Sequence, residues 1–111
     1  MQNVIILRDD AMGGGSQELG RKLMGTFLLK LWGSSKKPEG IIFYNGGVKL
    51  LTAAGGSLEA LEALEKQGVD LVACGTCIDF FGIGDQIEVG RVSGMEEILG
   101  IIQTAEKVVT I

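Results

Sequence analysis

Three short runs of apolar residues constrain the fold of this chain more than any other feature of the sequence. They lie at residues 4–7, 41–44 and 69–74, and the third is nearly uninterrupted. A strand that is apolar on both faces is typical of a parallel sheet covered by helices on both sides. We expect two further strands, a weaker peripheral one over residues 86–92 and a short one over residues 107–111.

Segments with helical periodicity separate these runs, and small polar residues or glycines mark their ends. The pattern predicts one helix from Ser16 to Gly33, a second from Ser57 to Gly68 and a third that begins at a capping box in residues 93–96. The apolar face of the first helix comprises Leu19, Leu23, Met24, Phe27, Leu28, Leu31 and Trp32. Strands that alternate with helices indicate an α/β fold, and 111 residues suit one domain that spans residues 1–111.

The composition excludes several classes of function. Because the chain has no histidine, it lacks Ser-His-Asp and Cys-His catalysis and histidine-bound zinc. Its two cysteines are too few for a four-cysteine metal site within one chain. The net charge of -4 disfavours nucleic acid as a partner. We therefore expect no cofactor, no metal ion and no nucleic acid.

The sequence also bears on location. No apolar stretch approaches the ~18 residues that a membrane-spanning helix needs. The first residues, Met-Gln-Asn, lead directly into an apolar strand, without the basic start and cleavage site of a secretory signal. We expect no membrane association, and a cytoplasmic protein whose thiols are reduced.

The strongest site pattern is Cys74-Gly75-Thr76-Cys77, which begins where the third predicted strand ends. Functional groups of an open parallel sheet collect beyond the carboxyl ends of its strands. Thr76 and Asp79 match a capped start for a short helix over residues 77–81, and the positive end of a helix stabilises a thiolate. The pair suits a persulfide carrier, a dithiol and disulfide couple, or half of a metal site between subunits; two small buried residues without a function are the alternative.

A second loop, residues 45–49, follows the second predicted strand. Consecutive strands are usually neighbours, so we expect this loop beside the cysteines. An amide, exposed backbone N–H groups and an ammonium would suit a pocket for a thiolate or persulfide anion. The candidate pocket residues are Asn45, Gly46, Gly47 and Lys49, with Gly75 and Thr76 between the two cysteines. A turn that merely needs glycine, with Lys49 in solvent, would explain the same residues.

Two other segments have weaker signals. Phe80 and Phe81 cannot both face one core from so short a helix, so we expect one of them at an oligomer interface or as a lid over the sulfurs. The glycine run at residues 13–15 has the position of an anion-binding loop. It matches no nucleotide-binding motif, and a flexible turn is the favoured interpretation.

Three segments of the chain resemble the DsrE/DsrF-like superfamily, most closely the carboxyl-terminal domain of YedF-type proteins. They are residues 19–24 with Phe27, residues 43–50, and residues 74–77 with Phe81 and Gly82. The resemblance extends over residues 4–111. It implies a three-layer α/β/α fold with a five-stranded, mainly parallel sheet, and a homo-oligomer or hetero-oligomer as the common state.

The resemblance also implies a chemistry. Sulfur-relay members of this superfamily carry a persulfide on a cysteine at the end of the third strand, which corresponds to Cys74 here, with Cys77 as a resolving or second thiol. YedF-type proteins are linked by name to selenium metabolism. They also carry an amino-terminal TusA-like domain, for which this chain has no residues. We therefore expect a TusA-like sulfur carrier, or another persulfide donor or acceptor, as a separate partner.

Three hypotheses follow from the sequence. In the first, Cys74 accepts sulfane sulfur and passes it on, as a sulfurtransferase or a simple carrier, and Cys77 assists. In the second, the two cysteines form a thiol-disulfide oxidoreductase. In the third, the chain is a non-enzymatic oligomeric binding module for a TusA-like partner. The sequence leaves open whether the protein is an enzyme.

Overall fold

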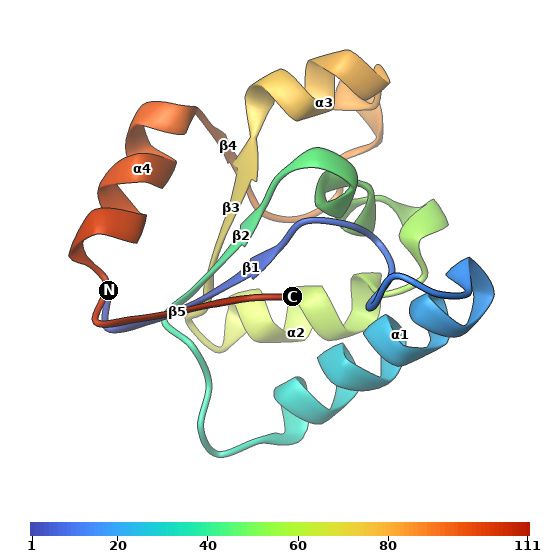
Figure 1. Ribbon diagram of the computed structural model, residues 1–111, viewed down its shortest axis with the longest axis horizontal. Helices are drawn as coiled ribbons and strands as arrows, with labels where there is room; N and C mark the ends of the chain where they lie inside the picture. The colour runs from blue at the N-terminus through green and yellow to red at the C-terminus, as the bar shows by residue number, and fades with distance from the viewer.

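The centre of the molecule is a five-stranded parallel sheet (Figure 1). A computed structural model describes all residues 1–111. In chain order the strands are β1 Asn3–Leu7, β2 Gly40–Phe43, β3 Asp70–Cys74, β4 Arg91–Ser93 and β5 Lys107–Thr110. Their order across the sheet is β4-β3-β2-β1-β5, and every neighbouring pair is parallel. The five predicted strands are thus confirmed, and the weak one is a three-residue edge strand.

The helices form the outer layers. Helices α1 (Gln17–Gly33) and α2 (Leu58–Lys66) cover one face of the sheet, while α4 (Met95–Thr104) lies on the other. Helix α3 (Gly75–Phe81) stands at the carboxyl end of β3 (Figure 1). Three short 3-10 helices complete the chain: η1 Asn45–Leu51, η2 Ala53–Gly55 and η3 Gly84–Gln86. This is the three-layer α/β/α fold that the resemblance implied.

The predicted helix ends are partly confirmed. The Ser16 side chain accepts a hydrogen bond from the Leu19 N–H at 3.1 Å and so caps α1. After α2 the chain turns at Gly68, whose φ of 97° favours glycine. The capping box at residues 93–96 is wrong, because Gly94 caps α4 and the Ser93 hydroxyl binds the Glu97 carboxylate instead.

The core is divided by the sheet into two unequal clusters. Sixteen buried residues form the larger one, between the sheet and the α1 and α2 layer, and six form the smaller one, beneath α4. On α1, Met24 and Leu28 are fully buried, whereas Leu19 and Leu23 are exposed by about half. The predicted apolar stripe of α1 therefore begins too early, because Leu19 and Leu23 are exposed whereas Phe27, Leu31 and Trp32 pack against the larger cluster.

An ion-pair network ties the β4 edge to its neighbours. The Arg91 guanidinium donates to both Asp70 carboxylate oxygens, at 2.8 and 2.9 Å, and to both Glu97 oxygens, at 2.8 and 2.7 Å. Hydrogen bonds from Arg91 and then from Ser93 lower the pKa of Glu97 to about 2. The network joins β3, β4 and α4, which share little apolar packing.

None of the helices combines the length and the apolar character that crossing a membrane requires.

Candidate thiol site

The two cysteines lie at the carboxyl edge of the sheet but in different environments. Cys74 ends β3 and is only 2% exposed, with its side chain in the smaller core cluster. Cys77 is in the first turn of α3 and is partly exposed. It lines a cavity of about 280 Å³ together with Asn45, Thr76, Phe80 and Phe81. Of the two sulfur atoms, that of Cys77 is the accessible one.

The start of α3 differs from the predicted one. The helix begins at Gly75 rather than Cys77, with Cys74 at the N-cap position and no side-chain cap. Thr76 is exposed within the first turn and caps nothing. Gly75 is where the helix passes β4: a Cβ atom there would lie 3.1 Å from a Val92 methyl group. The predicted capping pair is therefore not used, and the start of the helix packs closely against β4.

The backbone of Asn45 reaches the thiol pair from the neighbouring strand. Its N–H donates a hydrogen bond to the Cys77 Sγ at 3.0 Å. This contact follows from the predicted adjacency of β2 and β3, which is confirmed. Asn45 has a φ of 48° and is the one non-glycine residue in the left-handed region. Asparagine tolerates that conformation better than most residues, and strained backbone of this kind is concentrated at functional sites.

The two glycines after Asn45 set the position of η1 rather than line a pocket. Both are buried against the end of β1. A Cβ atom on Gly47 would lie 2.0 Å from the Leu7 carbonyl oxygen, and one on Gly46 would lie 2.4 Å from an Asp9 carboxylate oxygen. At Gly47 the obstacle is backbone, so only glycine allows this close approach of η1 to the end of β1.

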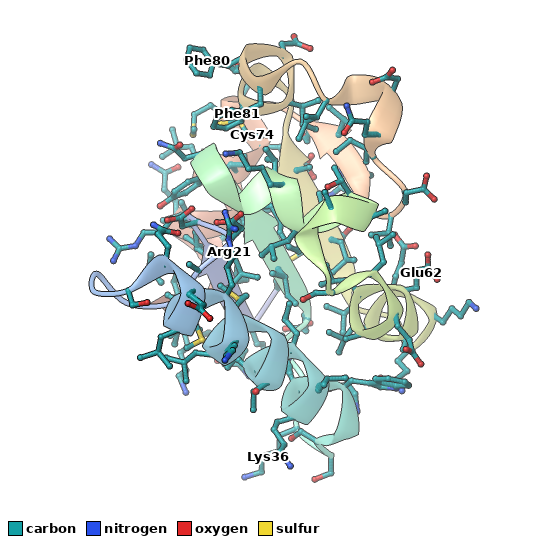
Figure 2. All side chains as sticks on the ribbon, turned by 90° about the vertical axis from the view of Figure 1, so that its right-hand side faces the viewer. Arg21, Lys36, Glu62, Cys74, Phe80 and Phe81 are labelled. Atoms are coloured by element: carbon teal, nitrogen blue, oxygen red, sulfur yellow. The ribbon has the colours of Figure 1, made fainter.

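Lys49 does not extend freely into solvent. Its Nζ lies 4.4 Å from the centroid of the Phe81 ring, a cation–π contact. The Phe80 ring packs edge-to-face on Phe81, with the centroids 5.4 Å apart and the ring planes at 85°. Phe80 itself is 85% exposed, and Figure 2 shows it projecting from the end of α3. Phe81 thus lines the Cys77 cavity, while Phe80 presents an apolar surface beside it.

The electrostatic environment of Cys77 keeps it a thiol. Burial raises the pKa of Cys77 above its usual value, and a hydrogen bond with the Cys74 thiol raises it further. The Asn45 N–H acts in the opposite direction, because it stabilises the thiolate. Burial and the neighbouring Cys74 thus oppose the stabilisation of a thiolate that the helix start was expected to supply.

A second cavity, of about 470 Å³, lies on the far side of Phe81. Its polar lining comes from separate segments: Asp10, Arg21, Lys49, Thr52 and Gln86. Sequence reasoning identified only Lys49, because no spacing pattern connects α1, the end of η1 and η3. By contrast, the glycine run at residues 13–15 is exposed and shares only Gly13 with a small cavity at the end of β1.

These features define a small α/β domain with a thiol pair at the carboxyl edge of its sheet. A profile of the DsrE/DsrF-like family matches residues 21–111, most of the chain. The chain therefore belongs to the DsrE/DsrF-like family, which is associated with sulfur relay. The particular closeness to YedF-type proteins stays a prediction.

Solved structures share the whole fold. The YchN protein from E. coli superimposes with a TM-score of 0.73 at 21% identity, and 100% of each chain is covered. A protein of unknown function from Methanobacterium thermoautotrophicum gives 0.67 at 17% identity, again over 100% of both chains. One from Bacteroides thetaiotaomicron gives 0.67 at 16% identity and covers 99% of this chain and 95% of the other. No curated protein matches this chain.

Proposed function

We propose that this protein is a sulfur-relay protein in which Cys77 receives sulfane sulfur from a donor persulfide and passes it to an acceptor thiol. The observation that carries the proposal is the accessible Cys77 Sγ at the sheet edge, in a cavity and in contact with a backbone N–H. A sulfur carrier needs a thiol that a donor can reach, a group that stabilises the loaded anion and a surface for the partner. Cys77, Asn45 and Phe80 supply these three.

The proposal changes the roles of the two cysteines. The family resemblance assigned the persulfide to Cys74, with Cys77 as the assisting thiol. Cys74 is only 2% exposed within the smaller core cluster, so a donor could reach it only after the residues around it had moved. Cys77 therefore receives the sulfur first, and Cys74 lies behind it as the second thiol.

The transfer step is a thiol exchange without net oxidation. Cys77, on losing its proton, attacks the outer sulfur of a donor R–S–SH. A new sulfur–sulfur bond forms at Cys77 while the sulfur–sulfur bond of the donor breaks, and the electron pair leaves with R–S⁻. That thiolate takes up the proton that Cys77 lost, so the products are the Cys77 persulfide and R–SH. The Asn45 N–H then faces the loaded group.

Intact-mass spectrometry after exposure to glutathione persulfide tests the assignment. We expect wild type and Cys74→Ser to gain ~32 Da that a reducing agent removes, and Cys77→Ser to gain nothing. Thr76→Ser is the matched control, because it lines the same cavity without a sulfur atom. An adduct that survives in Cys77→Ser and disappears in Cys74→Ser would return the carrier role to Cys74.

A thiol-disulfide oxidoreductase is the second candidate. The observation in its favour is that Cys77 packs against the small core cluster that contains Cys74. In such a protein both cysteines are needed, and oxidation removes two protons and two electrons as a disulfide forms. A loss of ~2 Da in wild type, with no sulfur adduct in any variant, would favour this function over sulfur relay.

We further propose that the protein works with a TusA-like carrier in the cytoplasm. Phe80 lies next to Cys77 and offers an apolar contact to a protein that brings its own thiol to the cavity. A thiol pair that cycles in this way requires a reducing compartment. Phe80→Ser should weaken transfer from a TusA-like persulfide protein and leave loading by a small persulfide unchanged; equal effects on both would contradict this contact.

We also propose that the chain forms a homo-oligomer. Four large apolar side chains are 37–59% exposed along β4 and the outer side of α4: Val92, Met95, Leu99 and Ile102. Their spacing places three of them on one helix face, where a second copy could cover them. Light scattering at micromolar concentration should give more than the monomer mass of 11.7 kDa. A Leu99→Glu variant should shift the mass toward the monomer, and a monomeric wild type would refute the proposal.

A further inference from the structure

The cavity behind Phe81 combines positive charge with an apolar wall. Arg21 and Lys49 contribute two cations and Asp10 one carboxylate, so the formal charge of the lining is positive in a chain whose net charge is -4. Phe81 and Ile83 supply the apolar part. A volume of about 470 Å³ is within the range of small-molecule sites. The lining therefore suits a small ligand with an anionic end and a carbon skeleton.

Both cations have unused hydrogen-bonding capacity. Lys49 forms no ion pair within the chain, and its ammonium faces only the Phe81 ring. Arg21 is paired with Asp10 by a single nitrogen at 3.5 Å, longer than a hydrogen-bonded pair. Its other donors remain free for a second carboxylate. Arg21 belongs to α1 and Phe81 to α3, and Figure 2 shows both near the carboxyl edge.

The cavity is next to the reactive thiol. Phe81 lines both this cavity and the one that holds Cys77, so the two cavities share this residue. Lys49 and Asn45 belong to the same 3-10 helix, which connects the ring contact at one end to the Cys77 hydrogen bond at the other. A molecule bound by its anionic end at Lys49 would lie against Phe81, which also lines the Cys77 cavity.

We propose that this cavity binds the carboxylate of a low-molecular-weight thiol, an amino acid or short peptide, whose persulfide form delivers sulfur to Cys77. The inference rests on the proposed sulfur-relay function and adds the substrate class at one end of the relay. Lys49 and Arg21 bind the carboxylate, and the carbon skeleton packs on Phe81. The transfer itself is the exchange already described, with the small thiol as R–SH.

Binding is tested first, in a protein that cannot accept sulfur. The probe is S-methylglutathione, a thioether with two carboxylates, added to ¹⁵N-labelled Cys77→Ser protein and followed by NMR. We expect shifts in the amides of Arg21, residues 49–55 and Gln86. Arg21→Gln and Lys49→Met are each added separately to this protein. Each should weaken the binding of the probe about tenfold or more, because it removes a charge-assisted hydrogen bond. Lys22→Gln, an exposed neighbour outside the cavity, is the matched control and should bind as before.

Loading is tested second, with donors that differ in charge. Glutathione persulfide should load wild-type Cys77 about tenfold faster than cysteamine persulfide, which has no carboxylate, and Lys49→Met should remove most of that preference. Equal loading by both donors, or probe binding that ignores both substitutions, overturns this inference and leaves the sulfur-relay function standing. Failure of every donor to load any variant instead refutes the sulfur-relay function, whatever the probe does.

Discussion

The two faces of the sheet are packed very differently. Under α1 and α2, sixteen buried residues form a continuous cluster, and those helices contribute five of them: Met24, Leu28, Ala60, Leu61 and Leu64. Under α4, six residues form the cluster, and Ile98 is the only one from the helix. Both outer layers leave apolar side chains exposed, Leu19 and Leu23 on α1 and Leu99 on α4, but the first face buries far more.

The difference bears on function because the cysteines lie where the two faces meet. Cys74 belongs to the smaller cluster, and Cys77 packs against both. A thiol placed deep in the larger cluster would be inaccessible, and one on the open surface would lack ordered neighbours. The thinly packed face thus allows a reactive group to be positioned by the sheet while remaining within reach of a partner.

The largest effect is expected in the larger cluster. Phe43 on β2 is fully buried there, and Phe43→Ala leaves a cavity that its tightly packed neighbours cannot fill. We expect a loss of about 3–5 kcal/mol in the free energy of unfolding, enough to unfold a marginal domain. Urea denaturation followed by circular dichroism measures it, with Phe43→Leu as the graded control. A loss smaller than that of Ile98→Ala would contradict the inference that this face is the more tightly packed of the two.

A smaller loss is expected on the α4 face. Ile98→Ala removes the single fully buried side chain that α4 contributes, but the partly exposed helix can settle onto the sheet. We expect a loss of about 2 kcal/mol in the free energy of unfolding, near the lower end of the range for such truncations. Hydrogen exchange should increase in α4 before it does in α1. Leu99→Ala, on the same helix and half exposed, should change stability by less than about 0.5 kcal/mol.

The sequence predicted the larger face better than the smaller one. Continuous apolar runs identified the three central strands, because strands covered on both sides are largely apolar, with Asp70 at the start of β3 as an exception. The edge strand β4 pairs with β3 and carries Arg91 with its two carboxylate partners, and its span was predicted too long because ion pairs leave no hydrophobic period. Leu19 and Leu23 were predicted buried because periodicity shows a helix face without showing where the sheet beneath it ends.

The candidate site shows the same division. The cysteines and Asn45 could be placed together from the sequence, since the ends of neighbouring parallel strands meet at one edge. How deeply each cysteine is buried could not be predicted from the sequence. That depends on the direction in which each side chain points in the folded chain. Arg21 and Gln86 carry no local signal at all, and only the packing of distant segments brings them to Lys49.

An intermediate effect is expected at Asn45, where the two faces meet. Asn45→Ala keeps the backbone N–H but places a β-carbon at a φ of 48° without the help of the amide side chain. We expect a loss of about 1 kcal/mol in unfolding free energy. Asn45→Gly should be close to neutral, because glycine adopts this conformation freely. Thermal unfolding compares the two; equal losses would mean that the amide side chain, not the backbone conformation, matters.

The smallest effect concerns the ion pairs that hold α4 to the sheet edge. The pKa of Glu97 is lowered from 4.5 to about 2, so the folded state binds this proton less tightly than the unfolded state. The stability from Glu97 is therefore fully present above about pH 4.5 and is lost as the pH falls from there toward 2. Glu97→Gln should be less stable than wild type near neutral pH, and the two stabilities should converge in acid. Because the pair is exposed, the difference should be smaller than that of Asn45→Ala.

Urea denaturation of both proteins across this pH range measures the convergence, with Glu96→Gln as the control. Glu96 is the adjacent exposed carboxylate of the same helical turn and has no ion-pair partner, so its removal should not reproduce the pH dependence. If the difference in stability between Glu97→Gln and wild type is the same at all pH values, the stability of the α4 face does not depend on this charge. That face would then be stabilised by Ile98 and the strand hydrogen bonds alone, and the two faces would differ only in their apolar packing.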